Sequence, residues 1–205
     1  MSSRPHLPAQ ERRELTVRAV IDLCGQQDPA NLTTAAIAKH MNLTQGALFR
    51  HFPSKDAIWE AVAHWVSERL MARLDSAVDP TGGPLDALER MFMTHIEFIT
   101  RHPGVPRLML GQLQHEEVTP AQRVVDAMFK RYRDRLMAIL ADSDESGELA
   151  DGLDREAAAT AFIGAVQGLV IQSMVVGDVG LVRVMAPRVF ALYRRGIAAS
   201  GTQAG

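Results

Sequence analysis

Three observations in the 205-residue sequence predict an all-α fold of about nine helices. First, apolar residues recur three or four positions apart through most of the chain, as at Ile58, Val62 and Val66, and this spacing is that of one helix face. Second, Pro and Gly separate the periodic segments, most densely at Pro80–Pro84. Third, no segment alternates apolar and polar residues as a strand does. With 47% apolar residues, the chain can bury a sizeable core.

The first periodic segment, Gln10–Gln27, is predicted to be a helix. Its arginines, Arg12, Arg13 and Arg18, are expected on the outer side, either as phosphate contacts or as ordinary surface. Cys24 is the only cysteine, so it cannot form a disulfide within the chain, and we expect a small buried residue rather than a redox sensor. The expected inward face is Leu15, Ala19, Val20 and Leu23.

The stretch Leu32–Lys55 is predicted to form two short helices joined by a tight corner. Thr33 can cap the first helix, because its hydroxyl can accept a hydrogen bond from a free backbone N–H of the first turn. Asn42 follows that helix and tolerates the left-handed conformation that a sharp turn needs. Thr44 can cap the second helix, Thr44–Phe52, and Pro53 ends it.

Two helices joined in this way are typical of a helix-turn-helix, in which the second helix lies in a DNA major groove. Gln45 can pair with adenine edges and Arg50 with guanine or a phosphate. Lys55 and the free N–H groups of the helix that follows can hold a phosphate. Each residue alone can be ordinary surface, and His51 alternatively caps its own helix. The predicted DNA-contacting residues are Thr33, Thr34, Thr44, Gln45, Gly46, Ala47, Phe49, Arg50, His51 and Lys55.

The order Thr-Thr-x-x-Ile-Ala, then Asn-Leu-Thr-x-Gly-x-Leu-Phe-x-His-Phe, then x-Ser-Lys-Asp resembles the DNA-binding domain of the TetR family of transcriptional regulators, which are often repressors. The resemblance covers Glu11–Val66. Two positions depart from the family pattern: Asn42 replaces the usual Gly, and Phe49 replaces the usual Tyr, whose hydroxyl often reaches a phosphate. The resemblance implies a homodimer formed by the last two helices, a small-molecule effector, and a fourth helix that transmits the state of the ligand site to DNA.

The charge distribution agrees weakly with a DNA-binding N-terminus. The net charge of the chain is −2. Residues 1–56 contain seven Lys/Arg and five Asp/Glu, whereas the remainder contains fifteen Lys/Arg and nineteen Asp/Glu. The N-terminal part is therefore the more basic one, which favours contact with phosphates.

We expect two domains: residues 9–56 as the helix-turn-helix domain, linked through a helix at 56–77, and residues 57–200 as the ligand-binding and dimerisation domain. The acidic residues 142–156 are expected to be a solvent-exposed loop. The expected later helices are Asp56–Ala77, Leu85–Arg101, Val105–Gln114, Pro120–Leu140, Ala157–Val176 and Leu181–Ala199.

The last two helices, within residues 157–199, are too apolar to hide all their faces in one small domain. A two-fold partner that completes a four-helix bundle would bury them, with Gly164 and Gly168 allowing a close approach of backbones. The alternative is packing within a single subunit. In a dimer, the two recognition helices would lie roughly 34–36 Å apart, so the operator is expected to be palindromic.

A cavity lined by the middle helices would suit an apolar or aromatic effector, because methionine adapts to varied ligands. His95 or Gln167 would orient the effector, and the alternative for every residue is plain core packing. The candidate ligand-binding residues are Met71, Met91, Phe92, His95, Ile99, Met109, Gln112, Met128, Phe129, Phe162 and Gln167.

The sequence contains no motif that predicts metal binding, a cofactor or catalysis. The seven His residues lack tight metal-ligand spacing, and there is no Gly-x-Ser-x-Gly and no phosphate-binding loop. No signal peptide and no apolar run of about 18 residues is recognised, so a soluble cytoplasmic protein is expected. The prediction is a TetR-like repressor without enzymatic activity. The alternatives are a helical ligand-binding protein without a DNA role and a small enzyme that uses His95.

Overall fold

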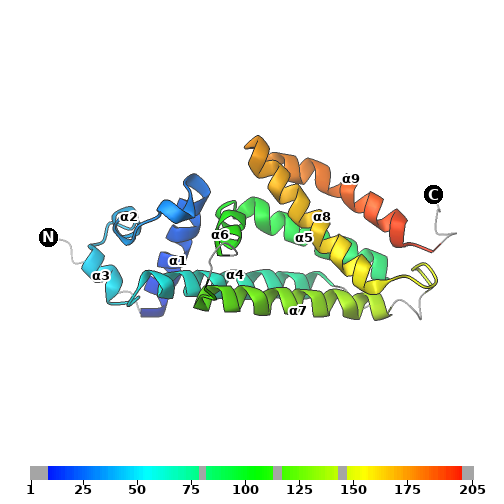
Figure 1. Ribbon diagram of the computed structural model, residues 1–205, viewed down its shortest axis with the longest axis horizontal. Coiled ribbons are helices and arrows are strands. Elements are labelled where there is room, and N and C mark those ends of the chain that lie inside the picture. Colours follow the sequence, from blue (N-terminus) through cyan, green and yellow to red (C-terminus); the bar gives the residue numbers. More distant parts are fainter. Residues whose placement is uncertain (1–8, 79–81, 113–116, 143–146, 200–205) are drawn as a thin grey trace. The chain divides into compact units, whose positions relative to one another are not determined.

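The computed structural model describes residues 9–78, 82–112, 117–142 and 147–199. Within these ranges it contains nine α-helices and no strand, which confirms the all-α prediction. Except in the second helix of the tight corner, the boundaries fall within two residues of the predicted ones. Residues 113–116, which include the predicted end of Val105–Gln114, lie outside the described ranges. The elements are α1 (Ala9–Gln26), η1 (Pro29–Asn31), α2 (Thr34–His40), α3 (Gln45–Phe49), α4 (Lys55–Ala77), α5 (Pro84–Arg101), α6 (Gly104–Gln112), α7 (Pro120–Asp142), α8 (Arg155–Val176) and α9 (Gly180–Ile197), shown in Figure 1.

The chain divides into two compact units. The N-terminal unit consists of the described residues up to Glu68 together with His102–Ala127. The C-terminal unit consists of Arg69–Arg101 and the described residues from Met128 onward. Helices α4 and α7 each contribute residues to both units. The N-terminal unit therefore contains α6 and the first half of α4 in addition to the three helices that the sequence predicts for it.

In the N-terminal unit, α6 packs closely against α1. A β-carbon at Gly104 would collide with the carbonyl oxygen of Ile21, so glycine permits this approach. Arg107 Nη1 donates a hydrogen bond to the Gly25 carbonyl oxygen at the end of α1, over 3.3 Å. Ala19 and Val20 are buried as predicted, whereas Leu15 is 41% exposed and Leu23 is half-buried, so the buried face of α1 is only partly the predicted one. The buried residues of α1 are Thr16, Val17, Ala19, Val20, Ile21 and Cys24.

Cys24 is buried in α1, as predicted. Burial raises the pKa of its thiol to about 12, because the thiolate would lose its hydration. The reactive form of a cysteine is the thiolate. Cys24 therefore serves as a small apolar core residue.

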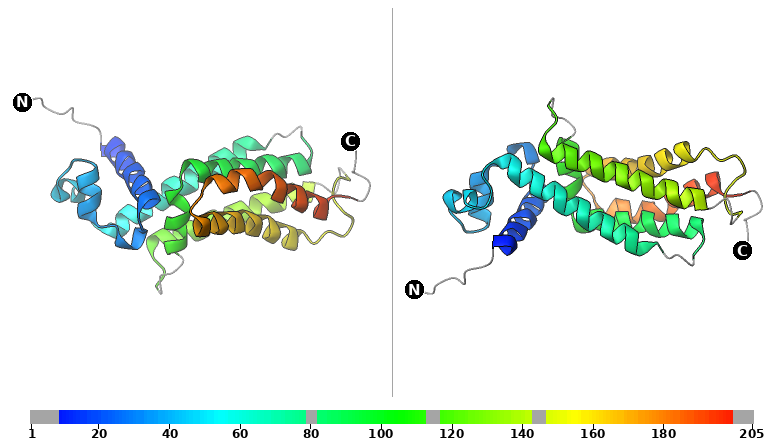
Figure 2. Two further views of the ribbon diagram at one scale, coloured as in Figure 1. Left: turned by 90° about the horizontal axis from the view of Figure 1, so that it is seen from above. Right: turned by 90° about the horizontal axis from the view of Figure 1, so that it is seen from below.

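The C-terminal unit is built around an aromatic cluster from α5, α7, α8 and α9. The Phe92 ring centroid lies 5.3 Å from that of Phe162 and 5.3 Å from that of Phe190. Tyr132 and Tyr193 extend the cluster, and each has its ring near Phe162. Edge-to-face and tilted pairs of this kind add to the stability that burial alone provides. The cluster holds α8 and α9 side by side and against α5, as Figure 2 also shows.

The segment between α7 and α8 differs from the exposed loop that its acidic composition predicts. Leu149 is buried and forms an isolated antiparallel bridge with Ala198. Glu148 Oε2 accepts a hydrogen bond from the backbone N–H of Leu85 in the first turn of α5. A carboxylate is stabilising at a helix N-terminus, where the backbone N–H groups lack partners. The described part of this segment therefore fastens the start of α5 to the end of α9.

Helix α8 is nearly all apolar, and only a third of its most hydrophobic window is buried in the single chain. By length and composition alone it is sufficient to cross a membrane, contrary to the sequence expectation that no run is long enough. Core and interface helices of soluble proteins meet the same criterion. Large apolar side chains remain exposed on α8 and on the neighbouring α9, namely Ile171, Val175, Val176, Val184 and Leu192.

Candidate nucleic-acid interface

The corner between α2 and α3 has the local structure that the sequence predicts. The Thr33 hydroxyl accepts a hydrogen bond from the Ala36 N–H over 3.1 Å. The Thr44 hydroxyl does the same for the Ala47 N–H over 3.2 Å. Asn42 has φ 54°, the left-handed conformation. Side-chain caps at both helix starts and a left-handed residue between them thus set the angle of the corner.

Helix α3 is shorter than predicted, because it ends at Phe49 rather than Phe52. The backbone N–H groups of His51 and Phe52 both donate to the carbonyl oxygen of Leu48, which turns the chain out of the helix. Pro53 disfavours a helical conformation in the residue before it. Phe52 is fully buried after this turn, so it anchors the end of α3 in the core of the N-terminal unit.

The outer face of α3 carries several of the predicted DNA-contacting residues. Thr44, Gln45, Gly46 and Arg50 are exposed, and Phe49 is 41% exposed although it is aromatic. Nothing lies within 4 Å of the position that a β-carbon at Gly46 would occupy. The helix is therefore narrow and open at its start, which suits insertion into a groove. Thr33 is exposed as well, whereas Thr34, Ala47, His51 and Lys55 are half-buried.

The start of α4 lies next to this face. The Ser54 hydroxyl accepts a hydrogen bond from the Ala57 N–H over 3.1 Å, so α4 is capped. Lys55 is the first residue of α4, and its Nζ lies 5.5 Å from the ring centroid of Trp59. The positive end of a 23-residue helix and an ammonium group therefore occur together, an arrangement that attracts phosphate.

Arg13 has a position that the sequence reasoning missed. It was expected to face outward, yet its guanidinium lies over the Phe52 ring, 4.5 Å from the centroid. Its Nη1 also donates a hydrogen bond of 2.8 Å to the His51 carbonyl oxygen. Arg13 thus connects α1 to the chain just after α3. The two partners are separated by 38 residues, so no local pattern could indicate this contact.

The candidate effector residues are divided between the two units. Met109 and Gln112 belong to the N-terminal unit, where buried Gln112 accepts a hydrogen bond from the Thr119 hydroxyl over 3.3 Å. Gln167 is exposed on α8 instead of facing inward, and Phe129 is half-buried. The candidates buried in the C-terminal unit are Met71, Met91, Phe92, Ile99, Met128 and Phe162.

His95 is the polar member of this group, and it pairs with a residue that the sequence reasoning did not select. Its Nδ1 lies 3.1 Å from the hydroxyl of Tyr132, and their ring centroids are 5.4 Å apart. Burial lowers the pKa of His95 to about 4 and raises the pKa of Tyr132 far above its usual value. Both side chains are therefore neutral at pH 7. His95 still keeps some accessible surface.

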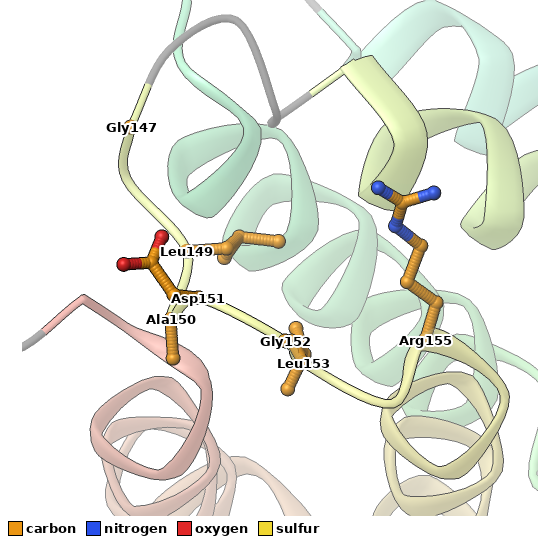
Figure 3. Close-up of a pocket in the computed structure, with 7 residues that line it drawn as sticks. All are labelled: Gly147, Leu149, Ala150, Asp151, Gly152, Leu153 and Arg155. Carbon is orange, nitrogen blue, oxygen red and sulfur yellow. The ribbon is translucent and has the colours of Figure 1, made fainter.

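A separate recess of about 270 Å³ lies beside the segment between α7 and α8 (Figure 3). Its lining is mostly backbone and small side chains, and its charged members are Asp151 and Arg155. Figure 3 shows these two side chains pointing apart rather than toward a common point. None of the candidate ligand-binding residues lines it. Among the residues that the structure describes, no three His, Cys, Asp or Glu side chains gather where a metal ion would bind.

Comparison with known proteins identifies the N-terminal unit. Residues 17–62 match the family described as bacterial regulatory proteins, tetR family. This stretch contains most of α1, all of α2 and α3, and the first turns of α4. Curated proteins align over more of the chain: the nucleoid occlusion factor SlmA of Vibrio cholerae is 27% identical over 158 residues, which are 77% of this chain and 81% of that protein.

Solved structures share the fold along nearly the whole chain. The ketosteroid transcriptional regulator KstR2 of Mycobacterium tuberculosis has a TM-score of 0.77 at 21% identity and covers 92% of this chain and 96% of its own. The regulator FadR from Bacillus subtilis, in complex with stearoyl-CoA, has a TM-score of 0.76 at 18% identity, over 90% and 98%. A TetR regulator from Chloroflexus aurantiacus reaches 0.78 at 16% identity, over 94% and 98%. Residues 17–62 therefore form a DNA-binding domain of the TetR-family type, and the chain as a whole has the fold of TetR-family transcriptional regulators.

Proposed function

We propose that this protein is a homodimeric repressor that binds a palindromic operator and is released from it by a small apolar or aromatic effector. The observation that carries the proposal is the outer face of α3, where Gln45, Gly46 and Arg50 are exposed on a capped, narrow helix. Only Leu48 of α3 is buried. A helix with one inward anchor and an open polar face has the shape needed for the major groove.

In this proposal Gln45 and Arg50 contact base edges, and Lys55 contacts a phosphate. Glutamine and arginine are the side chains best suited to adenine and guanine edges, respectively. Lys55 and the N-terminus of α4 fix the register on the backbone without reading sequence. Thr33, Thr44 and Phe49 flank this surface and complete the contact. Phe49 lacks the tyrosine hydroxyl usual at this position of the family, so one backbone contact is absent here.

The exposed apolar face of α8 and α9 supports a dimer. In the single chain Val175 is 82% exposed, Val184 67% and Leu192 62%. The β-carbon positions of Gly164 and Gly168 are open, so a partner helix can approach closely. A patch of this kind on a soluble protein is typical of an interface. Four such helices from two subunits would form a bundle and would set two copies of α3 at a fixed spacing.

The aromatic cluster of the C-terminal unit supports an apolar effector. His95 and Tyr132 place one neutral hydrogen-bonding pair among phenylalanine rings. Among the described residues, His95 has no hydrogen bond besides the one to Tyr132, so Nε2 is available to a ligand. An apolar wall with a few polar groups is the usual composition of a small-molecule site. The effector would act through its different affinities for the DNA-bound and free conformations.

Selection from a random duplex library, followed by binding assays, tests the DNA-binding part of the proposal. The wild-type protein should enrich a two-fold symmetric motif and bind it less tightly as salt rises. Arg50→Ala should relax the preference at one base pair at a cost of about 1–3 kcal/mol. Lys55→Ala should weaken binding to all DNA sequences alike, and it should reduce the number of ions released on binding, measured from the salt dependence, by about one. Lys130→Ala, at an exposed position of α7 outside both the DNA-binding surface and the α8–α9 face, is the control and should change neither. Failure to enrich any motif would refute the proposal.

A reporter promoter that carries the selected motif tests repression. Expression should rise when the regulator is deleted, and it should rise in its presence when the effector is added. A protein that raises expression instead would be an activator.

A role in nucleoid occlusion is the second candidate function, favoured by the names of the curated relatives aligned over 77% of the chain. Mapping of the bound chromosomal sites separates the two, since a repressor should occupy promoters.

A further inference from the structure

We infer that Thr34 is a specificity-determining positioning residue, which orients the side-chain amide of Gln45 so that it reads an adenine. The inference rests on the proposed DNA-binding function. Its basis is a hydrogen bond of 2.8 Å from Gln45 Nε2 to Thr34 Oγ1, across the corner between α2 and α3. Thr34 is the first residue of α2, and Gln45 is the first residue of α3.

The geometry leaves Gln45 able to read a base. Bidentate pairing with adenine uses one amide N–H as donor to N7 and the amide oxygen as acceptor from N6. The side-chain amide of glutamine has two N–H groups and one oxygen. In the inferred arrangement Thr34 holds the N–H that points away from the amide oxygen, so the N–H beside the oxygen and the oxygen itself remain for the base. The contact to Thr34 therefore does not compete with the contact to adenine.

The same bond removes an ambiguity that an exposed glutamine otherwise has. A free amide can turn over and present its two ends in either order, and each order matches a different base edge. Thr34 is half-buried at the start of α2, whereas Gln45 is exposed, so the hydroxyl is the better-fixed partner. It keeps the nitrogen end of the amide on the α2 side. Glutamine is also among the side chains that lose most rotamer freedom on ordering, and a preformed bond reduces that loss on DNA binding.

The hydroxyl groups of Thr33 and Thr34 make different contacts, and this difference supports the inference. Thr33 is the residue whose hydroxyl caps α2, by accepting from the Ala36 N–H. The Thr34 hydroxyl is not needed for the cap and instead accepts from Gln45. Alanine is favourable at a helical position such as Thr34, so removal of this hydroxyl leaves α2 intact. The function of Thr34 can therefore be tested separately from the fold.

The experiment measures base preference at each position of the motif that the wild-type, full-length protein selects from a random duplex library. Gln45→Ala should flatten the preference at one base pair per half-site, by roughly 5- to 100-fold. Thr34→Val, which keeps the shape, and Thr34→Ala should flatten the same base pair by about 5-fold or more and leave the other positions unchanged. Thr34→Ser should restore the wild-type preference. The double variant Thr34→Val/Gln45→Ala should match Gln45→Ala alone.

Three results would overturn the inference while leaving the regulator proposal intact. The first is an unchanged preference profile in both Thr34→Val and Thr34→Ala. The second is a uniform loss of affinity for all sequences, which would assign the Thr34 hydroxyl to a phosphate. The third is an effect of Thr34→Val that persists in the Gln45→Ala background. If the wild-type protein selects no motif, the proposed function itself fails and this inference fails with it.

Discussion

Replacement of His95 should remove part of the acid sensitivity of this protein. The folded chain holds His95 neutral, since burial lowers its pKa to about 4, whereas an unfolded histidine has a pKa of about 6.5. Between these two values the unfolded state binds a proton that the folded state does not. Acid therefore favours unfolding in this window, and the stability present above pH 6.5 falls as the pH decreases toward 4.

The size of the effect follows from the two pKa values. A pH of 5 lies about 1.5 pH units below the unfolded-state pKa of about 6.5, and each unit corresponds to about 1.4 kcal/mol of unfolding free energy. His95 should thus cost the wild-type protein up to about 2 kcal/mol of unfolding free energy at pH 5 relative to pH 7. His95→Gln cannot be protonated in this range and can still hydrogen-bond the Tyr132 hydroxyl. The variant should therefore lose less stability on acidification than the wild-type protein.

Urea unfolding followed by far-ultraviolet circular dichroism, at one fixed protein concentration, measures this difference at pH 7 and pH 5. The quantity of interest is the wild-type loss minus the His95→Gln loss, because carboxylates and other histidines contribute equally to both. His64→Gln is the matched control, since His64 is exposed on α4 and should keep the wild-type loss. Equal losses in the wild-type protein and His95→Gln would refute the reasoning.

Two further predictions concern the anchor of α3 and the subunit interface. Arg13→Ala removes a hydrogen bond to the His51 carbonyl and a contact with the Phe52 ring, so it should cost about 2–3 kcal/mol in urea unfolding. Arg18→Ala is the control, because the Arg18 side chain is 57% exposed and forms only a 4.0 Å ion pair with Glu14; it should lower the unfolding free energy by no more than about 0.5 kcal/mol. Equal losses in the two variants would show that Arg13 does not anchor α3. Val175→Asp and Leu192→Asp should each shift the protein from dimer to monomer in analytical ultracentrifugation, because charge is poorly tolerated in an apolar interface. Ala138→Asp, at an exposed position of α7, should leave the assembly state unchanged, and a persistent dimer in both α8–α9 variants would place the interface elsewhere.

The DNA-binding motif was predictable because its determinants are local. Thr33, Asn42 and Thr44 act on backbone groups within a few residues of themselves, so their identities already define the two caps and the turn. The same applies to the exposed face of α3. The extent of α3 was not predictable to the residue, since the turn after Phe49 depends on the burial of Phe52 in the core.

The effector candidates were less predictable, because an apolar stripe on a helix does not say which other helix it meets. Phe92 and Phe162 were selected by their type and do pack together, 5.3 Å between ring centroids. Gln167 was selected by the same reasoning and is exposed. Tyr132, the partner of His95, was missed because the two residues are 37 positions apart.

The sequence by itself determined the helices and the reading motif, because periodicity, caps and turn residues act over a few positions of the chain. Only the tertiary structure decided which faces of the helices meet. Three contacts join segments that are distant in the sequence. Arg13 contacts residues 51 and 52, the Glu148 carboxylate binds the start of α5, and α1 packs against Gly104. Such contacts depend on the packing of whole helices, because each one forms only where two complementary surfaces fit at close range.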